Sequence, residues 1–277
     1  MAGSARQALI DATARFTFSA TARLDAELLL AHALGIERQA FLLDLDRAVP
    51  PGFAALVERR AAEEPVAYLT GTRGFWTIEL AVDPRVLIPR ADSETLLEAA
   101  VAHFAGTAGP AAVLDLGTGS GALLLAALDQ WPAATGVGVD ASAGAVAVAQ
   151  ANARRLGLDA RATIEVGGWG AAALPVRAGG FDLLLCNPPY VADDAVLSRE
   201  VAGYEPASAL YAGSDGLDDL RVLADGLRGL VAPGGVACLE IGHDQGAAAG
   251  ALFRARGFGV ALRQDLGGRD RCLVVTP

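Results

Sequence analysis

Among the 277 residues of this chain, the segment most informative about architecture is Val113-Leu114-Asp115-Leu116-Gly117-Thr118-Gly119-Ser120-Gly121. Its apolar first half is typical of a strand, its second half is a glycine-rich loop, and Ala122-Leu123-Leu124 then opens a helix. Glycines permit positive φ and leave room for a ligand against the backbone, while a helix start presents unpaired N–H groups. The spacing is G-x-G-x-G, unlike the G-x-G-x-x-G of dinucleotide-binding folds, and no phosphate-binding lysine follows. The segment therefore predicts a strand, loop and helix that together bind a ligand. Its glycine spacing argues against a pyrophosphate as that ligand.

Strands and helices alternate from about residue 93 to the end of the chain. Periodicity predicts strands at 112–116, 134–139, 161–165, 181–186, 235–241, 258–263 and 271–275. It predicts helices at 93–105, 121–130, 142–156, 216–231 and 244–256. Because parallel strands need crossover connections, usually helices, this order predicts an α/β fold with a doubly wound, mostly parallel sheet of seven strands.

The second predicted strand ends in Val137-Gly138-Val139-Asp140. This places the Asp140 carboxylate at the edge of the sheet about twenty residues past the glycine loop, where an acidic residue can bind the hydroxyls of a ribose. The alternative is that Asp140 caps the helix beginning near Ser142. In combination with the glycine loop, Asp140 indicates a nucleoside ligand.

A second informative segment, Asn187-Pro188-Pro189-Tyr190, follows the predicted strand at 181–186. At the carboxyl edge of an open α/β sheet, it offers a side-chain amide, a carbonyl in proline-restrained backbone and a flat ring. The Asn187 side-chain oxygen and the Pro188 carbonyl can each accept one hydrogen of a planar NH2 group, as on adenine, cytosine or a carboxamide. The alternative is a plain strand-ending turn, which Asn-Pro-Pro also forms.

The first 72 residues show helical periodicity and little strand character. One stripe at the spacing of a helix face is formed by Leu24, Leu28, Ala31 and Leu34. Residues 75–82 then alternate in the period of a half-buried strand, and residues 86–88 can return against it. The sequence thus predicts a small all-helical domain at 1–72, a β-hairpin linker at 73–92 and the sheet domain at 93–277.

Composition narrows the class of protein. The net charge of −10, with no lysine, argues against broad nucleic-acid binding, which relies on a basic face. No run approaches the roughly eighteen apolar residues of a membrane helix, and no secretory signal is visible, so we expect a soluble, cytoplasmic protein without a membrane partner. The cysteines and histidines are dispersed, which predicts reduced thiols and no metal site: Cys186, Cys238, Cys272, His32, His103 and His243.

Taken together, the Asp115-x-Gly-x-Gly-x-Gly loop, Asp140 and Asn187-Pro188-Pro189-Tyr190 resemble class I S-adenosylmethionine-dependent methyltransferases that modify amino nitrogens. Nearly end to end, the chain is similar to one branch of that superfamily, the HemK or PrmC family of peptide chain release factor glutamine-N5 methyltransferases. The stretches that carry this closer match are 65–71, 86–90, Glu205-Pro206 with Ala209-Leu210, 215–217, 240–242 and 265–271.

This resemblance implies a Rossmann-like catalytic domain, a helical substrate-recognition domain and S-adenosylmethionine as methyl donor. The implied cofactor-binding residues are Gly117, Thr118, Gly119, Ser120, Gly121, Asp140, Trp169 and Asn187. The implied catalytic residues are Asn187, Pro188 and Tyr190, and the same tetrapeptide, with Pro189, is the implied substrate-binding site. For Asp115 we expect a structural role.

Two departures from the family pattern concern residues near these positions. The chain has Ala91-Asp92-Ser93-Glu94 where the family usually has Pro-Asp-Thr-Glu, which keeps the acidic and hydroxyl groups. It has Gly168 before Trp169 where the family often has an acidic residue. Gly168 therefore offers no side chain to the cofactor, and Trp169 is expected to stack on its adenine.

The implied substrate is the glutamine of the Gly-Gly-Gln motif of release factors, methylated at N5. Two other reactions use the same clamp: glutamine-N5 methylation of a large-subunit ribosomal protein, and adenine-N6 methylation of nucleic acid. The acidic net charge argues against the second. A non-catalytic protein that only binds S-adenosylmethionine is a further alternative, since a fold alone does not establish turnover.

Overall fold

The computed structural model describes residues 4–169 and 177–277. The chain divides into two compact units. Unit 1 comprises Met1–Thr72 together with Leu197–Tyr204, and unit 2 comprises Arg73–Val196 and Glu205–Pro277. The segment 197–204 was expected within the sheet domain, but its contacts group it with the helical unit.

Unit 1 is all helical in its described part. Its helices are α1 (Ala5–Arg15), α2 (Ala22–Leu34), α3 (Arg38–Leu42), α4 (Gly52–Ala61), α5 (Val66–Thr70) and α9 (Arg199–Tyr204). The core is formed by Leu9, Phe16, Leu29, Leu30, Phe41, Phe53 and their neighbours. The predicted stripe on α2 was wrong in two positions, because Leu24 and Leu28 are 39% and 36% exposed. Helix α2 has leucines on more than one face, so the helices packed against it decide which face is buried.

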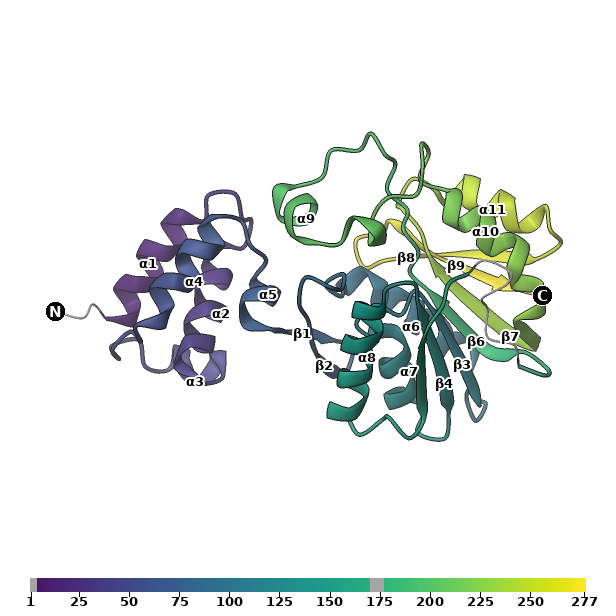
Figure 1. Cartoon of the computed structure of the whole chain (residues 1–277), viewed down its shortest axis with the longest axis horizontal. Coiled ribbons are helices and arrows are strands. Elements are labelled where there is room, and N and C mark those ends of the chain that lie inside the picture. Colours follow the sequence, from purple (N-terminus) through teal and green to yellow (C-terminus); the bar gives the residue numbers. More distant parts are fainter. Residues whose placement is uncertain (1–3, 170–176) are drawn as a thin grey trace. The chain divides into compact units, whose positions relative to one another are not determined.

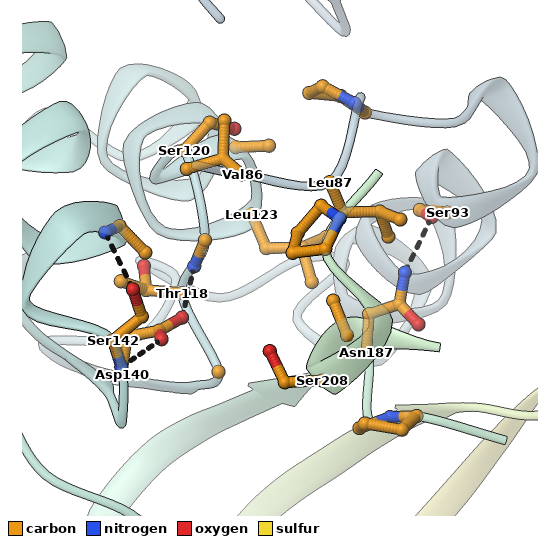
Figure 2. Close-up of a pocket in the computed structure, with 18 of the residues that line it drawn as sticks. Val86, Leu87, Ser93, Thr118, Ser120, Leu123, Asp140, Ser142, Asn187 and Ser208 are labelled. Atoms are coloured by element: carbon orange, nitrogen blue, oxygen red, sulfur yellow. Dashed lines mark hydrogen bonds between the residues drawn. The ribbon is translucent and has the colours of Figure 1, made fainter. Parts of the chain in front are cut away.

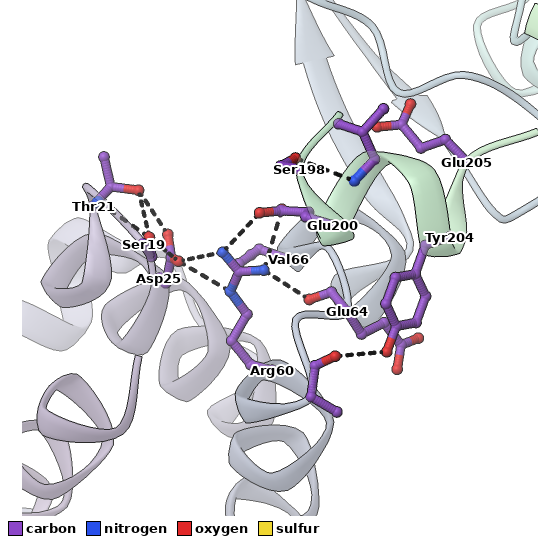
Figure 3. A network of polar contacts seen from close by, with 12 residues as sticks. Ser19, Thr21, Asp25, Arg60, Glu64, Val66, Ser198, Glu200, Tyr204 and Glu205 are labelled. Carbon is purple, nitrogen blue, oxygen red and sulfur yellow. Dashed lines mark hydrogen bonds and ion pairs between the residues drawn. The ribbon is translucent and has the colours of Figure 1, made fainter. Parts of the chain in front are cut away.

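Helix α9 is held in unit 1 by polar contacts (Figure 3). The buried Arg60 guanidinium donates to Asp25 Oδ2 at 2.8 and 3.0 Å and pairs with Glu200 Oε1 at 3.1 Å. The Tyr204 hydroxyl donates to the Ala62 carbonyl at 2.9 Å. These contacts are the reason that a segment following Asn187-Pro188-Pro189-Tyr190 in sequence belongs to the helical unit.

Unit 2 begins with a hairpin of β1 (Thr72–Phe75, whose first residue lies in unit 1) and β2 (Ile78–Ala81). The predicted continuous strand over 75–82 was wrong, because the chain turns at Trp76, where φ is +53°. Residues 86–88 do not form the expected returning strand. The alternation of Ile78 and Leu80 toward the core is nevertheless observed, since both are buried.

The main sheet of unit 2, within the described residues, has seven strands in the order β5-β4-β3-β6-β7-β9-β8. They are β3 (Ala112–Leu116), β4 (Thr135–Asp140), β5 (Ala162–Val166), β6 (Phe181–Cys186), β7 (Val231–Glu240), β8 (Gly259–Gln264) and β9 (Asp270–Thr276). Strands β3 to β7 run parallel to one another, and β9 runs antiparallel to β7 and β8. The predicted doubly wound, mostly parallel sheet is confirmed.

Helices cover both faces of this sheet (Figure 1). They are α6 (Glu94–His103), α7 (Ala122–Gln130) and α8 (Ala143–Arg155) on one face, and α10 (Asp218–Gly226) and α11 (Gly246–Arg254) on the other. Strand residues alternate between the two cores, as with Leu183 and Leu185 on one side and Leu184 and Cys186 on the other. Buried on both faces, such strands are continuously apolar. No helix in the described part of the chain is long and apolar enough to cross a membrane.

Candidate active site

A cavity of about 230 Å³ lies at the carboxyl ends of β3, β4 and β6. Residues predicted for the site line it as follows: Gly117, Thr118, Gly119, Ser120, Asp140, Trp169, Asn187 and Pro189. Gly121, Pro188 and Tyr190 are predicted site residues that do not line it. The position agrees with the rule that open α/β sheets bind ligands where the strand order reverses, here between β3 and β6.

The glycine loop is fixed by the neighbouring strand. The backbone N–H groups of Gly117 and Thr118 both donate to the Val139 carbonyl at 2.9 Å. Gly117, Gly119 and Gly121 have φ of +73°, +55° and +86°, in the left-handed region that other residues adopt at a cost. A Cβ on Gly117 would stand 2.8 Å from the Trp169 ring. Backbone and indole thus form a close cradle that a side chain on Gly117 would fill.

Asp115 lies beneath the loop and outside the cavity lining, as a structural role requires. Its Oδ2 accepts from the Thr118 hydroxyl at 2.7 Å and from the Leu124 N–H at 3.2 Å. Its Oδ1 is buried without a hydrogen-bond partner among the described residues. Burial raises the pKa of Asp115 to about 7, against the lowering effect of the Thr118 hydroxyl.

Asp140 connects the glycine loop to the next helix while facing the cavity (Figure 2). Its Oδ2 accepts from the Gly119 N–H and its Oδ1 from the Ser142 N–H, each at 2.9 Å. The cap of α8 is Ser142, whose hydroxyl oxygen accepts from the Ala145 N–H at 3.2 Å. Asp140 is therefore not the helix cap. Because each carboxylate oxygen accepts more than one hydrogen bond, Asp140 retains capacity for ligand hydroxyls.

Trp169 reaches the cavity from the loop after β5 and is held by an acidic side chain that the sequence reasoning missed. Its indole Nε1 donates to Asp219 Oδ1 at 2.8 Å. Asp219 lies in α10 and also lines the cavity. Partial burial raises the pKa of Asp219, while the indole N–H lowers it. Gly168 stands where the family often has an acidic residue and so offers no carboxylate after β5. Asp219 of α10 places a carboxylate at the cavity instead.

The Asn187 side chain is oriented by a hydrogen bond from its nitrogen. Nδ2 donates to the Ser93 hydroxyl oxygen at 3.2 Å, and Figure 2 shows the Asn187 oxygen directed away from Ser93. Ser93 stands at the start of α6 and is buried. The side-chain oxygen is consequently the end of the Asn187 amide that is available to a ligand NH group.

The turn after Asn187 is held from three directions. The Tyr190 carbonyl accepts from Gln245 Nε2 at 3.0 Å, and the Tyr190 hydroxyl donates to Glu240 Oε1 at 3.2 Å. A Cβ on Gly216 would stand 2.3 Å from the Tyr190 carbonyl oxygen, so the backbone passes too closely for any other residue. Burial raises the pKa of Tyr190. The Tyr190 side chain is thereby fixed as a neutral donor.

Glu240 ends β7 beside this turn and is 1% exposed. Burial raises its pKa to about 7, and the nearby Ser93 hydroxyl and the charge of Arg271 partly offset this rise. The only sequence signal for Glu240 was its position as a lone acid at the end of an apolar strand, the pattern that singled out Asp140. Residues 240–242 are among the stretches that resemble the family, but that resemblance implies no role for Glu240.

Another part of the cavity wall comes from 85–90 and 206–209, and Ser93 also lines the cavity. Glu205 joins the two, since its Oε2 accepts from the Ile88 N–H at 3.2 Å and its Oε1 pairs with Arg90. Asn152 joins the hairpin to the glycine loop: its Nδ2 donates to Ala81 O at 3.0 Å and to Ser120 O at 2.9 Å. Neither Glu205 nor Asn152 was given a role from sequence, because both act through contacts with distant segments.

The site's chemistry suits a nucleoside with a flat base. The glycine cradle approaches the ligand with backbone, Asp140 offers carboxylate oxygens, and Trp169 offers an aromatic ring. Asn187 adds one acceptor at the far end of the cavity from Asp140 (Figure 2). In the described residues, no group of three or more His, Cys, Asp or Glu side chains is arranged to hold a metal ion.

Two family models match the chain. Residues 7–71 match the PrmC N-terminal domain, and residues 113–202 match a methyltransferase domain. Among solved structures, a methyltransferase from Pyrococcus furiosus is 15% identical with a TM-score of 0.50, covering 80% of this chain and 96% of that one. At that identity the likeness shows the fold alone.

Curated relatives named release factor glutamine methyltransferase are much closer. The protein of Rhodospirillum rubrum is 46% identical, over 91% of this chain and 78% of its own length. That of Xylella fastidiosa is 45% identical, over 91% of this chain and 92% of its own length. That of Moorella thermoacetica is 40% identical over 97% of both chains. With this identity over nearly its whole length, and with the glycine loop, Asn187 and Pro189 lining one cavity, the chain belongs to the release factor glutamine methyltransferase family.

Proposed function

We propose that this protein methylates the side-chain amide nitrogen of the glutamine in the Gly-Gly-Gln motif of peptide chain release factors, with S-adenosylmethionine as the methyl donor. The observation that carries the proposal is the orientation of Asn187. Its nitrogen is engaged by Ser93 at 3.2 Å, so its oxygen is presented to an incoming NH2 group. The names of the relatives supply the substrate class.

The cavity residues fit S-adenosylmethionine. Gly117 and Gly119 would admit it against backbone, Asp140 would accept from its ribose hydroxyls, and Trp169 would lie against its adenine. When bound, S-adenosylmethionine supplies an electrophilic methyl group. Gly121 would contribute indirectly, by turning the chain into α7 with its φ of +86°.

The protein's part in the reaction is to orient a poor nucleophile. The lone pair of a carboxamide nitrogen is delocalised, and Asn187 Oδ1 and the Pro188 carbonyl would accept its two hydrogens and fix the direction of the nitrogen. Pro189 lines the cavity with Asn187. Tyr190, which lies outside the cavity lining and is held by Glu240, would limit rotation of the carboxamide. Alignment of this kind contributes up to roughly 7–11 kcal/mol in the best cases. The nitrogen gains the methyl group and releases one hydrogen to solvent as a proton.

Unit 1 would supply recognition of the release factor. The PrmC N-terminal domain match over residues 7–71 supports this assignment, because unit 1 does not contain the cavity residues. The substrate would therefore be selected by one unit and methylated by the other.

The direct test is to incubate the protein with labelled S-adenosylmethionine and, separately, a release factor, a large-subunit ribosomal protein and DNA, then locate the label by mass spectrometry. We expect label on the glutamine of Gly-Gly-Gln. Label on the ribosomal protein alone would reassign the substrate, and label on adenine would reject the proposal.

Two variants separate binding from chemistry. Asn187→Ala should abolish turnover and leave the cofactor dissociation constant largely unchanged. Asp140→Ala should raise that constant, because it removes both the ligand acceptor and the bond to the Gly119 N–H. Unchanged turnover in the first variant, or unchanged cofactor affinity in the second, would contradict the assigned role.

A further inference from the structure

We infer that Glu240 and Ser93 are positioning residues that fix which end of the Asn187 amide faces the substrate. This inference rests on the proposed function, since it concerns how Asn187 becomes an acceptor for the glutamine NH2 group. Neither residue needs to touch the substrate for this role. Both are buried beside the tetrapeptide, Ser93 at 4% and Glu240 at 1% exposure.

The problem to be solved is the ambiguity of an asparagine amide. Its oxygen and nitrogen ends have nearly the same shape but opposite hydrogen-bonding character. In only one orientation does the Asn187 amide offer an acceptor to the substrate NH2 group. In the other, the NH2 group of Asn187 would face the NH2 group of the substrate, and both groups can only donate. Ser93 contacts the Asn187 amide at 3.2 Å, but a hydroxyl both donates and accepts. Ser93 alone therefore leaves both orientations open.

Glu240 removes the ambiguity when it is ionised, because a carboxylate only accepts. The Ser93 hydroxyl lies close enough to the Glu240 carboxyl to lower its pKa. Glu240 Oε2 has no hydrogen-bond partner of ordinary geometry among the described residues, so the carboxylate keeps an unfilled acceptor for a donor. With its proton directed to Glu240, Ser93 has only lone pairs to offer Asn187. The amide nitrogen must then face Ser93, and the oxygen must face away from it.

Oxygen Oε1 of Glu240 carries an observed contact. The Tyr190 hydroxyl donates to it at 3.2 Å, so the carboxylate holds the Tyr190 end of the tetrapeptide directly, and it would hold the Asn187 end through Ser93. These contacts come from three separate elements: the start of α6, the loop after β6 and the end of β7. Such an arrangement keeps Asn187 ready before substrate arrives, which is how preorganised groups favour the transition state.

If Glu240 were protonated, it would no longer fix the orientation of the Asn187 amide. A neutral carboxyl is itself a donor, so Ser93 could turn its proton toward Asn187 and stabilise the inverted amide. Because burial raises the pKa of Glu240 to about 7, turnover should fall as the pH decreases through that region. The titratable and charged groups whose interaction with Glu240 is resolved are Tyr190, Asp92, Arg271, Cys186 and Cys272. Burial raises the pKa of Tyr190 and of both thiols, and Arg271 keeps its charge, so among these groups Glu240 is the one expected to change state there. The pKa of Asp115, beneath the glycine loop, is also raised to about 7, so the comparison with Glu240→Gln decides which carboxyl causes the step.

The first test compares Ser93→Ala with Ser93→Thr in the full-length protein. Alanine removes the connecting hydroxyl, and threonine retains it. We expect Ser93→Ala to lower kcat for release factor methylation by roughly tenfold or more, with cofactor affinity within about twofold of the parent. Ser93→Thr should restore most of the activity. Equal loss in both variants, or no loss in either, would overturn the inference.

The second test is the pH profile of kcat for the parent protein and for Glu240→Gln. The parent should lose activity on the acid side of about pH 7, and Glu240→Gln should be slower and lack that step. A parent profile that is flat through this region would overturn the inference, as would an unchanged step in Glu240→Gln. Thermal melting and cofactor binding check that each variant is folded; should Glu240→Gln not fold, the Ser93 pair and the parent profile still decide.

Failure of the proposed function would look different. If the parent protein transfers no methyl group to the release factor, the proposed substrate is wrong, and the activities of the variants cannot be compared. If the parent is active but the Ser93 and Glu240 variants match it in kcat and pH profile, only the positioning roles are wrong.

Discussion

Replacing Arg60 with methionine is expected to weaken the docking of α9 in unit 1. Arg60 is 3% exposed and joins three partners (Figure 3). It donates to Asp25 at 2.8 and 3.0 Å, pairs with Glu200 at 3.1 Å, and donates to the Glu64 carbonyl at 3.0 Å. Methionine fills similar space without charge, so the variant leaves Asp25 buried and Glu200 without this partner.

The size of the effect follows from burial. Breaking a buried ion pair by removing one member costs about 3–5 kcal/mol. The Asp25 carboxylate keeps the hydroxyl donors of Ser19 and Thr21, at 2.7 and 2.9 Å, so we expect the lower end, about 3 kcal/mol. The loss at Asp25 should appear in the unfolding of unit 1. Helix α9 loses only the pair with Glu200, whose side chain is 34% exposed, so its docking should weaken by about 1 kcal/mol and its amides should exchange with solvent roughly fivefold faster.

The assay is hydrogen exchange of residues 199–204 by mass spectrometry, with urea unfolding of the same samples. The matched control is Arg15→Met, which removes an arginine from an exposed pair with Glu58 and should leave both measurements unchanged. Exchange of 199–204 in Arg60→Met that equals the Arg15→Met rate would refute the reasoning, because the Arg60 network would then not hold α9.

Two further outcomes follow from the site. Gly117→Ala should weaken S-adenosylmethionine binding about tenfold or more in calorimetry, because alanine at φ +73° costs roughly 1–2 kcal/mol and its Cβ would stand 2.8 Å from Trp169. Gly168→Ala, where a Cβ meets nothing within 4 Å, is the control, and equal affinities in the two variants would reject the cradle. Asp115 has its pKa raised to about 7, so the folded state holds this proton more tightly than the unfolded chain does, and the resulting stability is present at low pH and lost as the pH rises through about 7. Asp115→Asn should flatten that part of the pH dependence of the urea unfolding free energy, by at most about 4 kcal/mol, and an unchanged curve would exclude Asp115 as its source.

The strands of unit 2 could be predicted closely because their signal is local. Strands β3 and β6 have the predicted bounds, 112–116 and 181–186, since apolar runs bounded by glycine or proline mark where a buried strand begins and ends. The helical unit was harder. Leu24 and Leu28 fit a helix face, but α2 has leucines on more than one face, and its buried side depends on the helices that pack against it.

The hairpin shows the same limit at shorter range. Alternation over 75–82 fits one strand, whereas the chain turns at Trp76, whose φ of +53° is unusual for a bulky residue. Side chains distant in sequence hold the turn by hydrogen bonds. The Trp76 N–H donates to Glu94 at 2.9 Å, and the Trp76 indole donates to Gln130 at 3.2 Å. The alternation of apolar residues along the sequence does not predict those contacts.

The sequence by itself determined the strand–loop–helix at 113–124, the acid at the end of β4 and the tetrapeptide after β6, because covalent order and local backbone preference place them at one edge of a parallel sheet. Tertiary structure alone decided what orients them. Ser93 meets Asn187 from 94 positions away along the chain, and Asp219 meets Trp169 from 50. Whether a buried polar group is donor, acceptor, charged or neutral depends on the neighbours that replace water around it, and only packing brings those neighbours together.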